Sequence, residues 1–103
     1  MIGLKRKIVT LCGSMKFLSE MQETAERLEL ERGYIVLTAV PHVLKRELTE
    51  DEKNLLGRLH RSKIDLSDAI FVVNPGGYIG QSVRSEIEYA RSAGKEVLFL
   101  ENN

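Results

Sequence analysis

The chain contains two kinds of hydrophobic pattern, which alternate along its length. One is a short run of almost continuous apolar residues, typical of a strand that is covered on both faces of a sheet. Runs of this kind lie at 7–12, 34–40, 69–74 and 96–100. Turn-forming or polar residues follow each run, so we expect four buried strands.

The other pattern has apolar residues at every third or fourth position and charged residues between them, which predicts amphipathic helices. It covers 15–32 and returns after Thr49 and again before Gly94. Thr49 and Glu52 have the spacing of a capping box, and Ser82 is placed to cap the third helix. We therefore expect three helices between the strands, while the structure of 44–48 stays open.

These elements follow one another in the order β-α-β-α-β-α-β, and 103 residues allow one domain, 1–103. Strands joined by helices run parallel, with helices on both faces of one sheet. We expect a small doubly wound α/β fold of the flavodoxin or Rossmann kind, with strand order 2-1-3-4. Ligands of such folds bind above the carboxyl ends of the strands between which the winding reverses. This rule points to the loops that follow the first and third strands, Gly13-Ser14 and 75–82.

The loop 75–82 is rich in glycine, which allows sharp turns and a close approach of the backbone to a ligand. Its amides, together with a helix N-terminus, suit an anion or sugar hydroxyls. The loop matches neither the dinucleotide fingerprint nor the P-loop. A plain strand-to-helix turn is therefore the alternative interpretation.

Glu86 is the acidic residue best placed to act in this crevice. On a helical projection it lies on the flank of the apolar stripe formed by Val83 and Ile87, about one turn after the helix begins. A partly buried carboxylate beside a loop that binds hydroxyls is suited to act as a nucleophile or a base. The alternative is an ion pair with Arg84 or Arg91, or a hydrogen bond that caps a loop amide.

The histidines and the cysteine have both functional and structural interpretations. His42 follows the second strand and lies either at the rim of the crevice or on a surface loop. His60, off the apolar stripe of the second helix, is either solvated or a group that changes its charge near neutral pH. Cys12 ends an apolar run and is expected to be a buried, unreactive thiol.

Asp68 is expected to shape the turn into the third strand. No His, Cys, Asp or Glu set has the spacing of metal ligands, so we expect no metal and no cofactor.

Charge and composition narrow the classes of partner. Lys and Arg number 15 and Asp and Glu number 15, so the chain lacks the basic character of proteins that bind nucleic-acid polymers or anionic membranes. No apolar run approaches the roughly 20 residues of a membrane span or the core of a signal peptide. We expect a cytoplasmic protein with a small-molecule ligand. Because the core is modest at this size, we also expect a homodimer or a larger homo-oligomer.

Three segments resemble, in the same order, motifs of the nucleoside 2-deoxyribosyltransferase superfamily, which includes the 2'-deoxynucleoside 5'-monophosphate N-glycosidases. Segment 9–14 is similar to the first strand and Gly-Ser loop, 36–43 to the second strand and its exit, and 85–95 to the helix that carries a glutamate. The resemblance implies that Glu86 attacks C1' of a (deoxy)nucleoside or its 5'-monophosphate and forms a covalent glycosyl-enzyme. Water or a second base then completes hydrolysis or base exchange. Substrate binding would fall to residues of the three loops: Cys12, Gly13, Ser14, His42, Gly77, Tyr78, Gly80 and Ser82.

Two positions depart from the family pattern. Glu88 stands where the motif has glycine, and His60 stands where the family uses an aspartate to assist the leaving base. A protonated His60 could act as the catalytic general acid instead, or activity is altered or lost. A non-catalytic module that binds a nucleotide or sugar phosphate is thus the alternative function. The family also commonly completes its pocket from a neighbouring subunit, a role that 101–103 could take.

The segment 74–86 has a second resemblance, to the glycine-rich motif of the cytokinin-type nucleotide phosphoribohydrolases, with a longer spacing here. Both groups act on N-glycosidic bonds. The resemblances therefore agree on the class of reaction.

Overall fold

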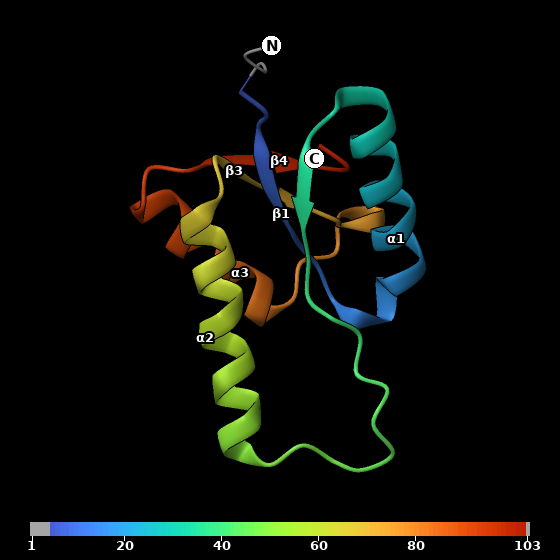
Figure 1. The fold of residues 1–103 in the computed structure, drawn as a ribbon, viewed down its shortest axis with the longest axis vertical. Helices are drawn as coiled ribbons and strands as arrows, with labels where there is room; N and C mark the ends of the chain where they lie inside the picture. Colours follow the sequence, from blue (N-terminus) through green and yellow to red (C-terminus); the bar gives the residue numbers. More distant parts are fainter. Residues whose placement is uncertain (1–4, 103) are drawn as a thin grey trace.

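Four parallel strands form one sheet in the computed structural model, which describes residues 5–102 (Figure 1). The strands are β1 (Ile8–Cys12), β2 (Ile35–Leu37), β3 (Ala69–Val72) and β4 (Glu96–Phe99). They lie in the order β2-β1-β3-β4, so both the parallel sheet and the predicted strand order are confirmed. The direction of winding changes between β1 and β3, at the centre of the sheet.

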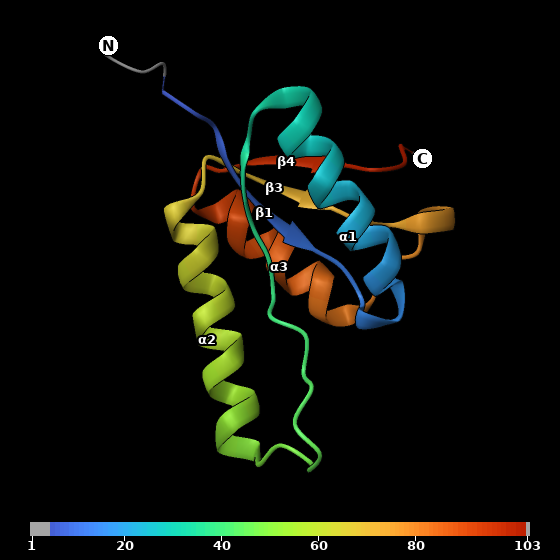
Figure 2. The same ribbon diagram turned by 45° about the vertical axis from the view of Figure 1, so that its right-hand side comes forward.

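Helices connect the strands and cover both faces of the sheet (Figure 2). The main helices are α1 (Leu18–Arg27), α2 (Glu50–Leu66) and α3 (Gln81–Ser92). A 3₁₀ turn, η1 (Met15–Phe17), precedes α1, and a π-helical segment, η2 (Leu28–Arg32), continues it, so the predicted helix over 15–32 is present. Gly33, with φ of 67°, ends this helix in the left-handed conformation that glycine adopts most readily. None of the described helices is long and apolar enough to cross a membrane.

The core has two parts, one on each face of the sheet. On the first face, Leu11 and Val73 pack against Met21 of α1 and Leu28 of η2. The second face carries the cluster that joins β1 and β3 to α2 and α3. Its buried members are Cys12, Ile64, Ile70, Val72, Val83, Ile87 and Ala90. The central strands are thus covered on both faces, as their nearly continuous apolar runs indicate.

β2 is shorter than its apolar run predicts. The run covers 34–40, but pairing with β1 ends at Leu37, and residues 38–49 leave the sheet as an irregular linker to α2. The exposed fraction of Val40 is 80%, and Pro41 has no N–H with which to continue the ladder. The segment 44–48, which fitted no pattern, belongs to this linker.

α2 is anchored at its C-terminal end. Of its 17 residues only Ile64 is buried, and the N-terminal part of the helix extends beyond the carboxyl ends of the strands, where the linker from β2 meets it (Figures 1 and 2). Leu55 and Leu59 each remain 47% exposed. The first turns of α2 and the linker therefore form an arm that projects from the body of the fold.

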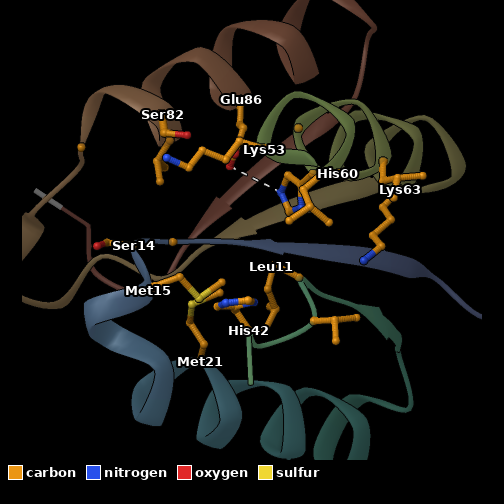
Figure 3. Close-up of a pocket in the computed structure, with 18 of the residues that line it drawn as sticks. Leu11, Ser14, Met15, Met21, His42, Lys53, His60, Lys63, Ser82 and Glu86 are labelled. Carbon is orange, nitrogen blue, oxygen red and sulfur yellow. Dashed lines mark ion pairs between the residues drawn. The ribbon is translucent and has the colours of Figure 1, made fainter. Parts of the chain in front are cut away.

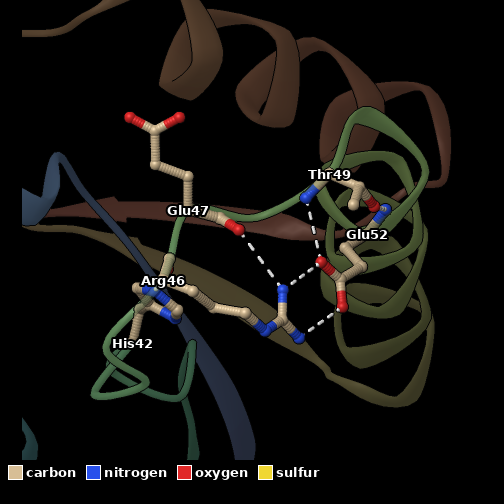
Figure 4. A network of polar contacts seen from close by, with 5 residues as sticks. All are labelled: His42, Arg46, Glu47, Thr49 and Glu52. Atoms are coloured by element: carbon tan, nitrogen blue, oxygen red, sulfur yellow. Dashed lines mark hydrogen bonds and ion pairs between the residues drawn. The ribbon is translucent and has the colours of Figure 1, made fainter.

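A surface network ties the linker to the start of α2 (Figure 4). The Thr49 hydroxyl accepts from the Glu52 N–H at 3.1 Å, and the Glu52 carboxylate accepts from the Thr49 N–H at 2.9 Å, which confirms the capping box. Both carboxylate oxygens of Glu52 also accept from the Arg46 guanidinium, at 2.8 Å each. The hydrogen bonds from Arg46, followed by the one from the Thr49 backbone, lower the pKa of Glu52 to about 2.

Candidate active site

A pocket of about 700 Å³ opens at the carboxyl end of β1 (Figure 3). Its walls are the end of β1 with the loop after it, the linker 39–48, the inner side of α2, and the segment from Tyr78 to Glu86. This volume lies within the range of pockets that hold small molecules. The pocket lies where ligands of doubly wound folds are expected, above the carboxyl ends of β1 and β3, between which the winding of the chain reverses.

Glu86 faces this pocket from α3, as its position on the helical projection predicts. Its side chain is 20% exposed, and its Oε1 lies 3.4 Å from Nε2 of His60. Within residues 5–102 this is the ion-pair partner of Glu86, and neither Arg84 nor Arg91 pairs with it. The expected alternative of an arginine pair is therefore wrong.

His60 lies inside the pocket rather than in solvent. Its side chain is 13% exposed, and its Nε2 is 3.5 Å from Sγ of Cys12. His60 precedes the buried Ile64 by four residues and therefore shares its face of α2. The leucines Leu55 and Leu59, which defined the apolar stripe in the sequence, are about half exposed. The interpretation of His60 as a solvated residue is wrong because the packed face of α2 is the face of Ile64.

Cys12 is 1% exposed and lies behind His60 and Glu86. Burial raises the pKa of the Cys12 thiol well above its usual range, and the neighbouring Glu86 carboxylate raises it further. The thiol is therefore protonated at neutral pH. The expectation of a buried cysteine is confirmed, and Cys12 is not among the residues that line the pocket, so the structure does not place it against a substrate as predicted.

The Gly13-Ser14 loop begins where β1 ends and lines the pocket. A Cβ atom on Gly13 would lie 3.2 Å from both the Met21 sulfur and the Val73 carbonyl oxygen, so a side chain here would crowd the end of β3. The Ser14 hydroxyl accepts from the Lys16 N–H at 3.4 Å and so caps η1. Both residues are positioned as predicted.

The beginning of α3 differs from the prediction. The N-cap is Gly80, which makes no side-chain capping bond, and Ser82 lies inside the first turn. Ser82 is not the cap because the backbone becomes helical already at Gln81, after the extended Gly80. The first N–H groups of α3 are thus left without a side-chain cap beside the pocket, which Gly80 and Ser82 both line.

Of the two neighbouring loop residues predicted to bind substrate, Tyr78 lies in the pocket wall and Gly77 does not. Tyr78 lines the pocket, with its ring edge-to-face against Phe17 and the Lys16 ammonium 3.5 Å from the ring centroid. Gly77 is not among the lining residues; its N–H donates to the Asn74 carbonyl, and its φ is 80°. Gly77 therefore forms the turn after β3 and does not reach the pocket.

His42 lines the pocket from the linker and is also exposed. Its Nε2 donates to the carbonyl oxygen of Arg46 at 3.0 Å. Both interpretations of this residue, rim and surface loop, therefore hold.

Asp68 and Glu101, which lie outside the pocket, have structural partners. The Asp68 carboxylate accepts from the Ile8 N–H at 2.8 Å, so its side chain ties the turn before β3 to the start of β1 and makes no hydrogen bond to the described residues of the turn itself. The Glu101 carboxylate accepts from the Gly76 N–H at 3.0 Å, and the Glu101 N–H donates to the Asn74 side chain at 2.9 Å. Glu101 is thus engaged within its own chain, and Asn103 lies outside the described residues.

Lys53 also lines the pocket, and sequence reasoning missed it. Figure 3 shows its side chain, from α2, directed to the side of the pocket that carries Ser82. Lys53, Gly57, His60 and Ile64 are spaced by four, three and four residues, which places them along one face of α2. That stripe, and not the leucine stripe, is the pattern that would have identified Lys53.

Comparisons with known proteins bear on the fold. No protein-family model and no curated protein matches this sequence. Among solved structures, the chain is similar to the 2-deoxyribosyltransferase of the psychrotolerant bacterium Bacillus psychrosaccharolyticus, an enzyme described as a biocatalyst for the synthesis of nucleosides. The TM-score is 0.66 at 16% sequence identity, and the match covers 89% of this chain and 70% of that chain. The two proteins therefore share a fold.

Proposed function

We propose that this protein cleaves or exchanges the N-glycosidic bond of a (deoxy)nucleoside or nucleoside 5'-monophosphate, with Glu86 as the nucleophile. The observation that carries the proposal is the position of the Glu86 carboxylate, partly exposed in the wall of a pocket whose volume suits a small molecule. The pocket lies at the switch point of a fold shared with a 2-deoxyribosyltransferase. Gly13, Ser14, Gly80 and Ser82 supply hydroxyl and backbone groups around it.

The reaction follows a double displacement. A Glu86 carboxylate oxygen attacks C1' while the bond from C1' to the base breaks, and the bonding electron pair leaves with the base. Protonated His60, 3.4 Å from Glu86 and lining the same pocket, donates a proton to the departing base. Water or a second base then attacks C1', and the carboxylate leaves with its electron pair. Neutral His60 takes up the proton that is released, from the water or from the attacking N–H group of the incoming base. Two inversions at C1' give net retention.

The polar end of the pocket suits the 5' side of the substrate. The uncapped N–H groups at the start of α3 and the hydroxyls of Ser14 and Ser82 are donors for an anion. The ammonium of Lys53 adds a positive charge on the same side (Figure 3). We therefore infer that a 5'-monophosphate binds more tightly than the nucleoside.

The test measures release of free base by chromatography after incubation with a panel of deoxynucleosides and their monophosphates. Glu86→Gln removes the nucleophile while keeping the size of the side chain, and we expect the rate to fall by at least about 10³-fold. Glu88→Gln is the matched control, because Glu88 lies two residues away on the exposed side of the same helix. Full turnover by Glu86→Gln would show that the carboxylate is not the nucleophile.

One observation favours a binding module as the second candidate function. His60 lies 3.4 Å from Glu86, so a protonated His60 neutralises the carboxylate that catalysis would require to be free. In that case nucleoside monophosphates would raise the melting temperature by mass action, yet no base would be released over a long incubation.

A further inference from the structure

Three side chains from distant parts of the sequence meet where His60 and Glu86 line the pocket (Figure 3), with the buried Cys12 behind them. Cys12 Sγ at the end of β1, a ring nitrogen of His60 on α2 and a carboxylate oxygen of Glu86 on α3 all lie within 4.8 Å of one another. The distance from Sγ to Nε2 is 3.5 Å, and the distance from Nε2 to Oε1 is 3.4 Å. In the described part of the chain, this is the one group of three such donors. Sequence spacing did not reveal it because each donor comes from a different element.

These separations match the edges of a tetrahedral zinc site. Zinc bonds of about 2.3 Å to sulfur and about 2.0–2.1 Å to nitrogen and oxygen, at tetrahedral angles, separate sulfur from nitrogen by about 3.5 Å and nitrogen from oxygen by about 3.4 Å. Both measured distances have these values. The fold therefore already holds two edges of the coordination shell at the required length.

We propose that Cys12, His60 and Glu86 bind a divalent cation of the zinc class, with the fourth coordination position open to the pocket. Thiolate, imidazole and carboxylate are the donors that zinc accepts, whereas magnesium and calcium take oxygen ligands. On binding, the Cys12 thiol releases its proton to solvent and forms the metal–sulfur bond as thiolate. The thiolate and the carboxylate then balance the charge of the cation, so the buried complex is neutral. His60 and Glu86 line the pocket, which supplies the entry path.

While a cation is bound to this site, Glu86 cannot act as the nucleophile. Bonding to the cation neutralises the carboxylate charge and fixes its position, which makes both of its oxygens poorer nucleophiles toward C1', so zinc inhibits any base release that depends on Glu86. The proposal uses the same side chains as the proposed function but does not rest on that activity, because binding is measured without a nucleoside.

The test titrates untagged, metal-free protein with Co²⁺, and then displaces Co²⁺ with Zn²⁺. We expect one Co²⁺ per chain, with a thiolate-to-cobalt charge-transfer band and the strong visible absorption of tetrahedral Co²⁺. Loss of a direct ligand in His60→Asn should weaken binding by at least about 100-fold, the upper range found for groups that only support a ligand. Cys12→Ala should abolish the charge-transfer band. His42→Asn removes the other histidine of the chain and should keep both the affinity and the band.

Circular dichroism of each variant shows whether it has folded. Because His60 is on the pocket wall, its replacement keeps the test valid even if the buried Cys12 does not tolerate alanine. The absence of a charge-transfer band in the wild-type protein, or unchanged affinity in His60→Asn, overturns the site. If the metal-free protein releases no base, the proposed function is contradicted but the metal site is not. The failure of one proposal can therefore be told from the failure of the other.

Discussion

Replacement of Ile64 by alanine tests how the fold holds the catalytic face of α2. Ile64 is fully buried in the cluster between the sheet and α3, and it is the only buried residue of α2. Leu55 and Leu59 are about half exposed and lie at least one turn away, so neither can fill the space left by the missing side chain. We therefore expect a cost in the middle of the range for such truncations, about 3 kcal/mol.

That magnitude is measurable without loss of the native state. A domain of this size has a free energy of unfolding of about 5–15 kcal/mol, so Ile64→Ala should remain folded at room temperature. Urea denaturation followed by circular dichroism gives the difference directly. A loss of about 3 kcal/mol corresponds to a fall of about 12–24 °C in melting temperature. Ile64→Val should cost only about 1 kcal/mol.

The matched control is Leu66→Ala, which removes an aliphatic side chain of the same size from the same helix. Leu66 is 69% exposed, so its loss should change stability by no more than about 0.5 kcal/mol. If Ile64→Ala costs as little as Leu66→Ala, α2 is not anchored by this contact. The explanation given for the position of His60, four residues earlier, would then fail as well.

Three further predictions concern the ligand, pH and assembly. Lys53→Ala should weaken binding of a nucleoside monophosphate about tenfold or more while leaving that of the nucleoside unchanged, as measured by calorimetry. The pKa of Glu52, about 2, lies below its ordinary value of 4.5, so its contribution to stability is complete above pH 4.5 and is lost as the pH falls towards 2. The difference in urea midpoint between wild type and Glu52→Gln should therefore shrink over that interval and should not change above it. If the chain forms a homo-oligomer as expected, we predict that its interface covers the exposed apolar side chains Val43 and Leu44 on the linker, 82% and 58% exposed, and that Val43→Asp lowers the mass measured by sedimentation.

The topology was predictable because local signals agreed with one another. The apolar runs of β1 and β3 are too short for helices and too continuous for one-sided strands, and this combination indicates a sheet covered on both faces. With a helix between each pair of strands, few arrangements remain. The end of β2 was predicted less well, since Val40 is apolar but lies outside the sheet. The hydrophobic pattern alone does not show at which residue a strand stops pairing with its neighbour in the sheet.

Among the helical residues of the site, the sequence predicted the position of a side chain only where the apolar stripe of its own helix was enough to show which face is packed. Glu86 was placed correctly because α3 packs on the stripe of Val83 and Ile87 that its own sequence displays. His60 was placed incorrectly because the leucines of α2 suggest one packed face, whereas tertiary packing uses the face that contains Ile64. The approach of Cys12 to both side chains depends on three elements meeting, which no spacing along the chain records.

The two roles of the central carboxylate make opposite demands on the same oxygen atom. A nucleophile needs an oxygen free to approach C1', whereas a metal ligand needs that oxygen bonded. The 3.4 Å separation between Glu86 and His60 places the nucleophile beside the general acid in the first role and forms a tetrahedral edge in the second. A chelator should therefore increase base release in a preparation that carries zinc, and added zinc should reverse the increase. If the chelator lowers base release instead, the cation takes part in the reaction, and Glu86 acts through the metal rather than on the sugar.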